Sequence, residues 1–218
     1  IQGLPVVMCL DRGGLVGEDG VTHHGVFDMA AFGAVPGLTI AAPMNEPELR
    51  NMMYTALGSG HPFMIRYPRG HGEGLPWRGE KFETLPVGRG RRLREGADVA
   101  LLTVGTVGNA AARAAGRAAA EGVSVAHYDL RFVKPLDEAL LDEVGRKFRR
   151  VVTVEDGSLR GGVGEAVAAF FNGRGYDVRV QRLGIGDEWV EHGTPGQLYA
   201  LCGYDEEGIL RALLDTRA

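Results

Sequence analysis

The sequence predicts an α/β protein built from two units, the end of a parallel-sheet domain followed by a second α/β domain. Short apolar runs alternate with segments whose apolar residues recur at helical spacing, in both halves of the chain. A stretch rich in glycine, proline and charge separates the halves. Alternating strands and helices favour parallel sheets with right-handed crossovers. We therefore expect domains at residues 1–70 and 98–218, joined by a linker at 71–97.

The first unit is expected to contain three strands and two helices. The strands are the continuous apolar runs at 5–10, 38–42 and 63–65. Such runs are typical of strands covered on both faces. One helix is expected at 27–34. Another should begin after Asn45, which can cap a helix with Pro47 in its first turn.

The second unit is expected to continue the same alternation. Strands are predicted at 99–104, 123–130, 150–154 and 176–183. Helices are predicted at 109–121, from 135–137 onward, at 162–172, from 194–195 onward and at 205–214. The pair Thr194-Pro195 is a strong helix start, because an N-cap residue precedes proline at the first helical position. The arginine-rich stretch 88–96 is expected to be a solvated hairpin.

Composition narrows the class of protein. A hydrophobic share of 44% is enough for a buried core, and a net charge of −4 does not favour a nucleic-acid partner. No apolar run is long enough for a membrane helix, and no signal peptide is evident. Cys9 and Cys202 lie in apolar surroundings and are expected to be buried free thiols in the cytoplasm. Because the chain opens on Ile1 just before a core strand, we also expect a fragment.

Most residues with chemical potential lie in one loop, residues 11–28, directly after the first strand. Ligands in open α/β sheets bind outside the carboxyl ends of strands, so this position suits a site. The loop holds five glycines, an arginine, several carboxylates and two imidazoles. Such groups can bind an anion and move protons. On composition alone an ordinary surface loop is an equally good interpretation. The spacing matches neither a Walker loop nor a dinucleotide fingerprint.

A second polar group, residues 66–70, follows the third strand. Adjacent parallel strands deliver their carboxyl ends to the same edge of a sheet, so Arg12 and Arg69 are expected to converge on one phosphate. Two guanidinium groups suit such a dianion. The alternative is that one or both of Arg66 and Arg69 form salt bridges or cover the linker, and this alternative carries more weight for Arg66 than for Arg69.

The motifs resemble the 1-deoxy-D-xylulose-5-phosphate synthase family of transketolase-like thiamine-diphosphate enzymes. The matching segments are 11–28, 41–52, 66–70, 132–137 and 191–193. The first is the most specific, because the related transketolase segment lacks its Asp-Arg opening and its His-Gly-x-Phe-Asp ending. The resemblance covers nearly the whole chain.

The resemblance implies a fold and a reaction. Residues 1–70 would end a pyrimidine-binding domain, and residues 98–218 would form the C-terminal transketolase-like domain. The family condenses pyruvate with D-glyceraldehyde 3-phosphate and releases CO2, with thiamine diphosphate and Mg²⁺ as cofactors. Its product leads to isoprenoid precursors, thiamine and pyridoxal. The family also suggests a homodimer.

The resemblance also implies roles for four residues. Arg12 and Arg69 would hold the phosphate of glyceraldehyde 3-phosphate, and Asp19 would bond its hydroxyls. His23 would lie near the cofactor adduct and assist proton transfer, so His23 and Asp19 are the expected catalytic residues. The neighbouring His24 is equally consistent with a packing role.

Two features of the family do not occur in this sequence. They are the Gly-Asp-Gly motif followed by asparagine, which binds the diphosphate through Mg²⁺, and the glutamate that activates the aminopyrimidine. Asp156-Gly157 is a poor substitute for the former, because it belongs to the final domain. We therefore assign no metal ligand here and expect the N-terminal segment of the same protein as a partner.

The remaining motifs are expected to be structural. The glycine-rich stretch 105–108 favours close packing over anion binding. The stretch 161–165 is interpreted as close packing or as a contact with another domain. His127 is expected in the core or an interface, and His192 at the surface or an interface. Two other functions stay open: a transketolase or 2-oxo-acid dehydrogenase E1 β-type subunit, and a non-catalytic assembly module. Use of pyruvate without a lipoyl carrier would separate the enzymes, and the polar loop 11–28 argues against the assembly module.

Overall fold

The first sheet of the computed structural model, which describes residues 1–215, has the strand order β1-β3-β2-β7. Its strands are β1 (Val7–Leu10), β2 (Thr39–Ala41), β3 (Phe63–Arg66) and β7 (Phe132–Lys134). The helices α1 (Asp28–Gly33) and α2 (Glu46–Leu57) connect the first three strands. These strands run parallel, which confirms the predicted sheet. Asn45 caps α2 as expected, because its side chain accepts a hydrogen bond from the Glu48 amide.

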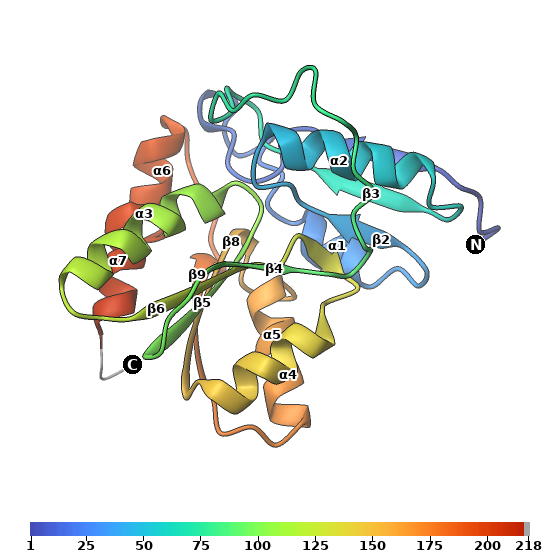
Figure 1. Cartoon of the computed structure of the whole chain (residues 1–218). Coiled ribbons are helices and arrows are strands. Elements are labelled where there is room, and N and C mark those ends of the chain that lie inside the picture. The colour runs from blue at the N-terminus through green and yellow to red at the C-terminus, as the bar shows by residue number, and fades with distance from the viewer. Residues whose placement is uncertain (216–218) are drawn as a thin grey trace.

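The fourth strand of this sheet comes from the second half of the chain. β7 pairs antiparallel with β2, so the two halves share a sheet (Figure 1). A buried ion pair also joins the halves: Arg131 donates from Nε and Nη2 to the Glu48 carboxylate of α2, at 2.8 and 2.9 Å. These contacts fix the second domain against the edge of the first.

The second sheet has the strand order β4-β6-β5-β8-β9. Its strands are β4 (Arg91–Arg94), β5 (Val99–Val104), β6 (Val125–Asp129), β8 (Arg150–Ser158) and β9 (Arg179–Ile185). All pairs are parallel except β4 with β6. The four parallel strands were each predicted from their apolar runs.

Helices cover both faces of the second sheet (Figure 1). They are α3 (Val107–Ala120), α4 (Glu138–Lys147), α5 (Val163–Gly173), α6 (Pro195–Leu201) and α7 (Glu206–Leu214). Val99 and Leu101 of β5 pack in one core with α3 and α7, whereas Ala100 and Leu102 pack in the other with α4 and α5. This alternation is the two-residue period of a strand between two helical layers. None of the described helices is long and apolar enough to cross a membrane.

Two local expectations are wrong. Residues 88–96 do not form a solvated hairpin, because β4 pairs with β6 across the second sheet and Arg91 reaches the buried Asp129 and Glu48. Cys9, on the edge strand β1, is a free thiol but is exposed, and not buried as expected. Cys202 is half-buried and free.

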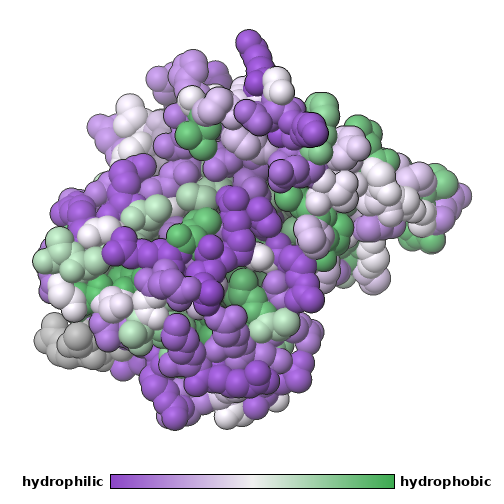
Figure 2. Space-filling model, viewed as in Figure 1, coloured by the Kyte–Doolittle hydropathy of each residue, from purple (hydrophilic) through white to green (hydrophobic). Residues whose placement is uncertain are grey.

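Hydrophobic residues gather at the projecting end of the first domain. Figure 2 shows them at the side of the molecule where the N-terminus lies in Figure 1. Large exposed apolar side chains of this domain include Leu4, Val6, Met53, Tyr54 and Leu57. A gathering of exposed apolar side chains is typical of a surface that another segment or chain covers.

Candidate functional site

The polar loop 11–28 leaves the carboxyl end of β1 and folds back on itself. The Gly14 amide donates to the Gly25 carbonyl at 2.8 Å, and the Gly25 amide donates to the Arg12 carbonyl at 3.1 Å. A Cβ atom at Gly25 would lie 2.2 Å from the Arg12 oxygen, so only glycine permits this approach. The Gly13 amide donates to the Tyr67 carbonyl beyond β3, which places the loop beside the second polar group.

Three of the four predicted site residues meet at this edge of the sheet. Arg12 Nε donates to Asp19 Oδ2 at 3.2 Å, and Arg69 Nη1 donates to the same carboxylate oxygen. Asp19 lies in the short 3-10 helix η1 (Gly17–Asp19) and is a quarter exposed, whereas the two arginine side chains are 41% and 53% exposed. The expected convergence of Arg12 and Arg69 is therefore present, with a carboxylate between the two guanidinium groups.

The charges of this cluster keep the carboxylate ionised. The hydrogen bond from Arg69 is the main cause that lowers the pKa of Asp19; burial opposes it, and Arg12 acts in the same direction as Arg69. The same contact raises the pKa of Arg69. Two further carboxylates lie near these cations: Asp11 Oδ2 is 3.4 Å from Arg12 Nη1, and Glu18 acts on Arg69. Each guanidinium still keeps N–H groups that these carboxylates do not use. The cluster can therefore accept a further anion such as a phosphate.

His23 lies on the same loop but does not bond the arginine–aspartate cluster. Its side chain is exposed, and its Nδ1 lies 2.9 Å from Thr22 Oγ1. His24 differs, because its Nδ1 accepts a hydrogen bond from the Val16 amide at 3.1 Å. This contact supports the packing interpretation of His24.

Arg66, at the end of β3, is a structural residue. Its Nε donates to Asp28 Oδ2 at 2.7 Å, and its Nη2 donates to the carbonyls of Gly25 and Asp156 at 3.1 and 3.0 Å. Only 4% of the side chain is exposed. Arg66 therefore ties the loop to the second domain, in agreement with the salt-bridge alternative for this residue.

The second domain holds the opposite side of the loop, and the sequence did not indicate this. Asp156 of β8 accepts a hydrogen bond from the Leu15 amide at 3.0 Å. A Cβ atom at Gly20 would lie 2.4 Å from His192 Nε2, so the imidazole packs against the loop next to Asp19. This agrees with the interface role considered for His192. The only available signal for Asp156 was its place at the end of a buried strand.

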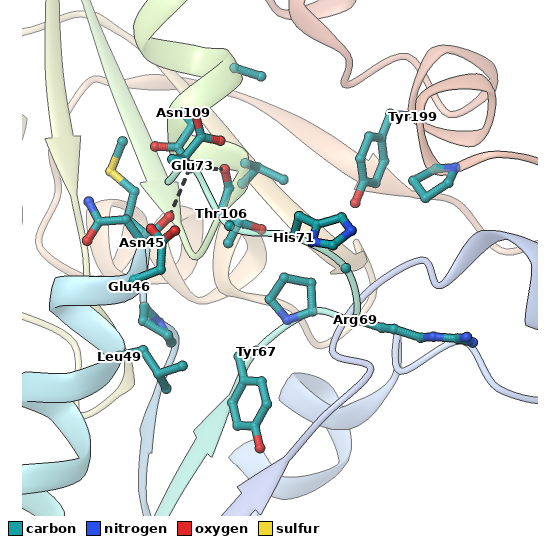
Figure 3. A pocket seen from close by; sticks show the side chains of 18 of the residues that line it. Asn45, Glu46, Leu49, Tyr67, Arg69, His71, Glu73, Thr106, Asn109 and Tyr199 are labelled. Carbon is teal, nitrogen blue, oxygen red and sulfur yellow. Dashed lines mark hydrogen bonds between the residues drawn. The ribbon is translucent and has the colours of Figure 1, made fainter. Parts of the chain in front are cut away.

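A cavity of about 710 Å³ lies next to the cluster, between the two domains. Figure 3 shows that α2 and the segment after β3 line one side. Thr106 just before α3, Asn109 of α3 and Tyr199 of α6 line the other. Arg69 stands at its rim, and its side chain extends toward the loop that carries Asp19. The cluster is therefore reached from an open interdomain space.

The other motifs agree with their structural interpretations. A Cβ atom at Gly108 would lie 3.1 Å from Met44 Sδ, and one at Gly164 would lie 2.5 Å from Thr153 Oγ1, which indicates close packing. His127 is 1% exposed, and its Nε2 lies 2.9 Å from Thr103 Oγ1. Among the described residues no group of three or more His, Cys, Asp or Glu side chains could hold a metal ion.

Comparisons with known proteins cover both domains. Residues 1–73 match the family model of the transketolase pyrimidine-binding domain, and residues 88–209 match that of the transketolase C-terminal domain. A 1-deoxy-D-xylulose-5-phosphate synthase of Bacteroides fragilis is 57% identical over 100% of this chain and 34% of its own length. That of Bacteroides thetaiotaomicron is 56% identical over 98% of this chain and 33% of its own length. The chain thus spans about a third of the length of these relatives.

A solved structure has the same fold. It is described as a split gene transketolase, an inactive β4 tetramer, and matches with a TM-score of 0.85 at 28% identity. The match covers 97% of this chain and 66% of that one. The two-domain α/β architecture is therefore that of a transketolase.

Proposed function

Because the chain belongs to the transketolase family and closely matches 1-deoxy-D-xylulose-5-phosphate synthases, we propose that it is the aldehyde-binding part of such a synthase. The complete protein condenses pyruvate with D-glyceraldehyde 3-phosphate and releases CO2. The observation that carries the proposal is the meeting of Arg12, Asp19 and Arg69 at the carboxyl edge of the first sheet.

Arg12 and Arg69 bind the phosphate of the aldehyde. Each guanidinium gives one N–H to Asp19 and offers others to a phosphate oxygen, and charge-assisted bonds of this kind are strong. Asp19 holds the two cations at one point despite their mutual repulsion. Its lowered pKa keeps it an acceptor, so it also bonds a hydroxyl of the aldehyde.

His23 moves a proton at the reacting end of the aldehyde. Thr22 Oγ1 contacts Nδ1 of the imidazole, so Nε2 is the nitrogen that faces a reacting group. Its position on the same loop as Arg12 and Asp19 supports this role, because one loop then sets the distance between the phosphate and the reacting carbon. His23 also lies beside the cofactor in this proposal.

The rest of the protein holds the cofactor diphosphate. Thiamine diphosphate, when bound, supplies the carbon centre that accepts the pyruvate-derived unit. The described residues of this chain do not fit a magnesium site, since they lack a cluster of carboxylate or imidazole ligands. We therefore assign the metal, together with the diphosphate, to the N-terminal segment.

That segment is the proposed partner of this chain, within a cytoplasmic homodimer. The exposed apolar residues around β1 and α2 support a covered surface there. The split gene transketolase supports the idea that a chain of this architecture can exist apart from the rest of an enzyme.

Reconstitution tests the proposal. The chain is mixed with the N-terminal segment of a matching synthase, thiamine diphosphate and Mg²⁺, and CO2 release from carboxyl-labelled pyruvate is measured. We expect release that depends on both segments and is faster with glyceraldehyde 3-phosphate than with glyceraldehyde. Equal rates with the two aldehydes would remove the phosphate assignment, and turnover of ketose phosphates without pyruvate would indicate a transketolase instead.

A further inference from the structure

A buried carboxylate of the second domain contacts the loop of the proposed aldehyde site. Asp156 lies in β8 and is 4% exposed. Its Oδ1 accepts hydrogen bonds from the Leu15 amide at 3.0 Å and the Tyr204 hydroxyl at 2.8 Å, and its Oδ2 accepts one from the Tyr199 hydroxyl at 3.3 Å. Three donors from three segments thus converge on one carboxylate.

The loop is shaped to this carboxylate. Gly14 has a φ of 85°, and a Cβ atom there would lie 1.9 Å from Asp156 Oδ2. Both the backbone conformation and the space therefore require glycine. The next residue, Leu15, is 1% exposed and packs in the core of the second domain. The loop is thus held by a hydrogen bond and by burial at the same point.

The contact of Gly14 and Leu15 with Asp156 lies between Arg12 and Asp19 in the sequence. Arg12 is the proposed phosphate ligand of the loop, and Asp19 bonds Arg69. Arg12 precedes Gly14 by two residues and has a φ of 58°, a strained value for a side chain of its size. Its carbonyl is held by the Gly25 amide, which also donates to the Gly14 carbonyl. Asp19 lies shortly after Leu15 in the sequence and is the last residue of η1. A displacement of Leu15 would therefore move Arg12 and Asp19 relative to Arg69, which lies in the segment after β3.

The neighbouring carboxylate of Glu155 has a structural role and serves as a comparison for Asp156. Glu155, the preceding residue of β8, is equally buried but accepts hydrogen bonds from the amides of Val163 and Gly164, both at 2.8 Å. Those bonds stabilise the first turn of α5 within the second domain. Neither of these hydrogen bonds reaches the loop that carries the charged cluster.

We propose that Asp156 is a positioning residue of the aldehyde site, which sets the place of Arg12 and Asp19 through its hydrogen bond to the Leu15 amide. The proposal rests on the function proposed above. In this proposal the second domain affects substrate binding through Asp156. No residue of the second domain contributes a charge to the Arg12–Asp19–Arg69 cluster.

Three variants of the complete enzyme test this role. Asp156→Ala removes the acceptor, Asp156→Asn keeps an acceptor oxygen for Leu15, and Glu155→Gln is the matched control on the same strand. Steady-state assays give KM and kcat for each substrate. Hydrogen–deuterium exchange of residues 12–25 reports the loop without depending on activity.

We expect Asp156→Ala to raise the KM for glyceraldehyde 3-phosphate about tenfold, with a much smaller change for pyruvate, and to speed exchange in the loop. Asp156→Asn should restore both values to within about threefold of the wild type, because the amide oxygen replaces the carboxylate oxygen. Glu155→Gln should lower Tm without a selective change in either measurement. If Asp156→Ala does not fold, Tyr204→Phe is the second variant, because it removes the hydroxyl that donates to Asp156 Oδ1. It should raise the aldehyde KM and speed loop exchange by less than Asp156→Ala.

Two results would overturn the proposal. One is unchanged loop exchange and aldehyde KM in Asp156→Ala or Tyr204→Phe, and the other is an equal loss for both substrates. Failure of the underlying function looks different: Arg12→Ala and Arg69→Ala would then leave the aldehyde KM unchanged, while Asp156→Ala would still speed exchange of the loop.

Discussion

Two arginine–carboxylate groups involve the loop 11–28 and the end of β3, and they differ in burial. In the buried group, Arg66 is 4% exposed and directs its donors to Asp28 and to two backbone carbonyls. In the exposed group, Arg12 and Arg69 share Asp19 and face solvent with unused donors. The same pair of residue types therefore has all its partners within the protein where water is excluded, and keeps unused donors where it is not. We propose that these unused donors distinguish a binding arginine from a structural one.

The largest effect should come from the buried group. Arg66→Ala leaves the Asp28 carboxylate nearly buried without its partner, and such a loss costs about 3–5 kcal/mol of unfolding free energy. Urea denaturation of the reconstituted protein measures it. A loss as small as that of an exposed arginine would contradict the distinction between the two groups.

A pH-dependent effect should follow from two buried groups of β6. Burial raises the pKa of Asp129 to about 6, with Arg91 opposing. Its contribution to stability is then fully present below about pH 4 and is lost as the pH rises through 6. Burial, helped by Arg91 and Arg94, lowers the pKa of His127 to about 4. Its contribution is present above about pH 6.5 and is lost as the pH falls through 4.

These two contributions oppose each other between pH 4 and 6 in the wild type. Asp129→Asn removes one of them, so the variant should lose stability on acidification more steeply than the wild type, by up to about 3 kcal/mol. Denaturation curves at several pH values in this range test the prediction. Parallel plots of unfolding free energy against pH for the two proteins would show that Asp129 does not titrate between pH 4 and 6. Asp19→Asn is the control and should leave the pH dependence of stability in this range unchanged.

A smaller but selective effect is expected in the exposed group. Arg12→Ala and Arg69→Ala should each raise the KM for glyceraldehyde 3-phosphate tenfold or more, since a charged hydrogen bond to the phosphate is lost. The KM for pyruvate and the Tm should change little. Equal losses for both substrates would count against a phosphate site, and His23→Ala should instead lower turnover more than it weakens aldehyde binding.

The smallest effect is expected from a surface ion pair far from the loop. Arg117 donates to Glu206 and Glu207 between α3 and α7, and all three side chains face solvent. Because exposed pairs contribute little, Arg117→Ala should change neither Tm nor either KM measurably. A clear loss of stability would show that exposure alone does not predict the cost of losing an arginine.

Sequence reasoning predicted the elements whose signals are local. β5 was predicted at its observed bounds from one apolar run, and Asn45, Asp137 and Thr194 begin helices through side-chain caps. It missed β4 and β7, which are short and gain their order from pairing with distant strands. It also divided the chain at 1–70, 71–97 and 98–218, and that division stays a prediction. β4 lies within the expected linker, and β7 joins the first sheet.

The candidate site divides in the same way. The convergence of Arg12 and Arg69 followed from the sequence, because parallel strands place their carboxyl ends at one edge. The bridging position of Asp19 and the anchor at Asp156 did not, since they depend on how a glycine-rich loop packs against a second domain 141 residues further along the chain. Local pattern determined which strands form and which charged residues follow them. Only tertiary packing decided which of those charges are buried as structure and which stay free to bind, because burial is a property of neighbours that the sequence does not place side by side.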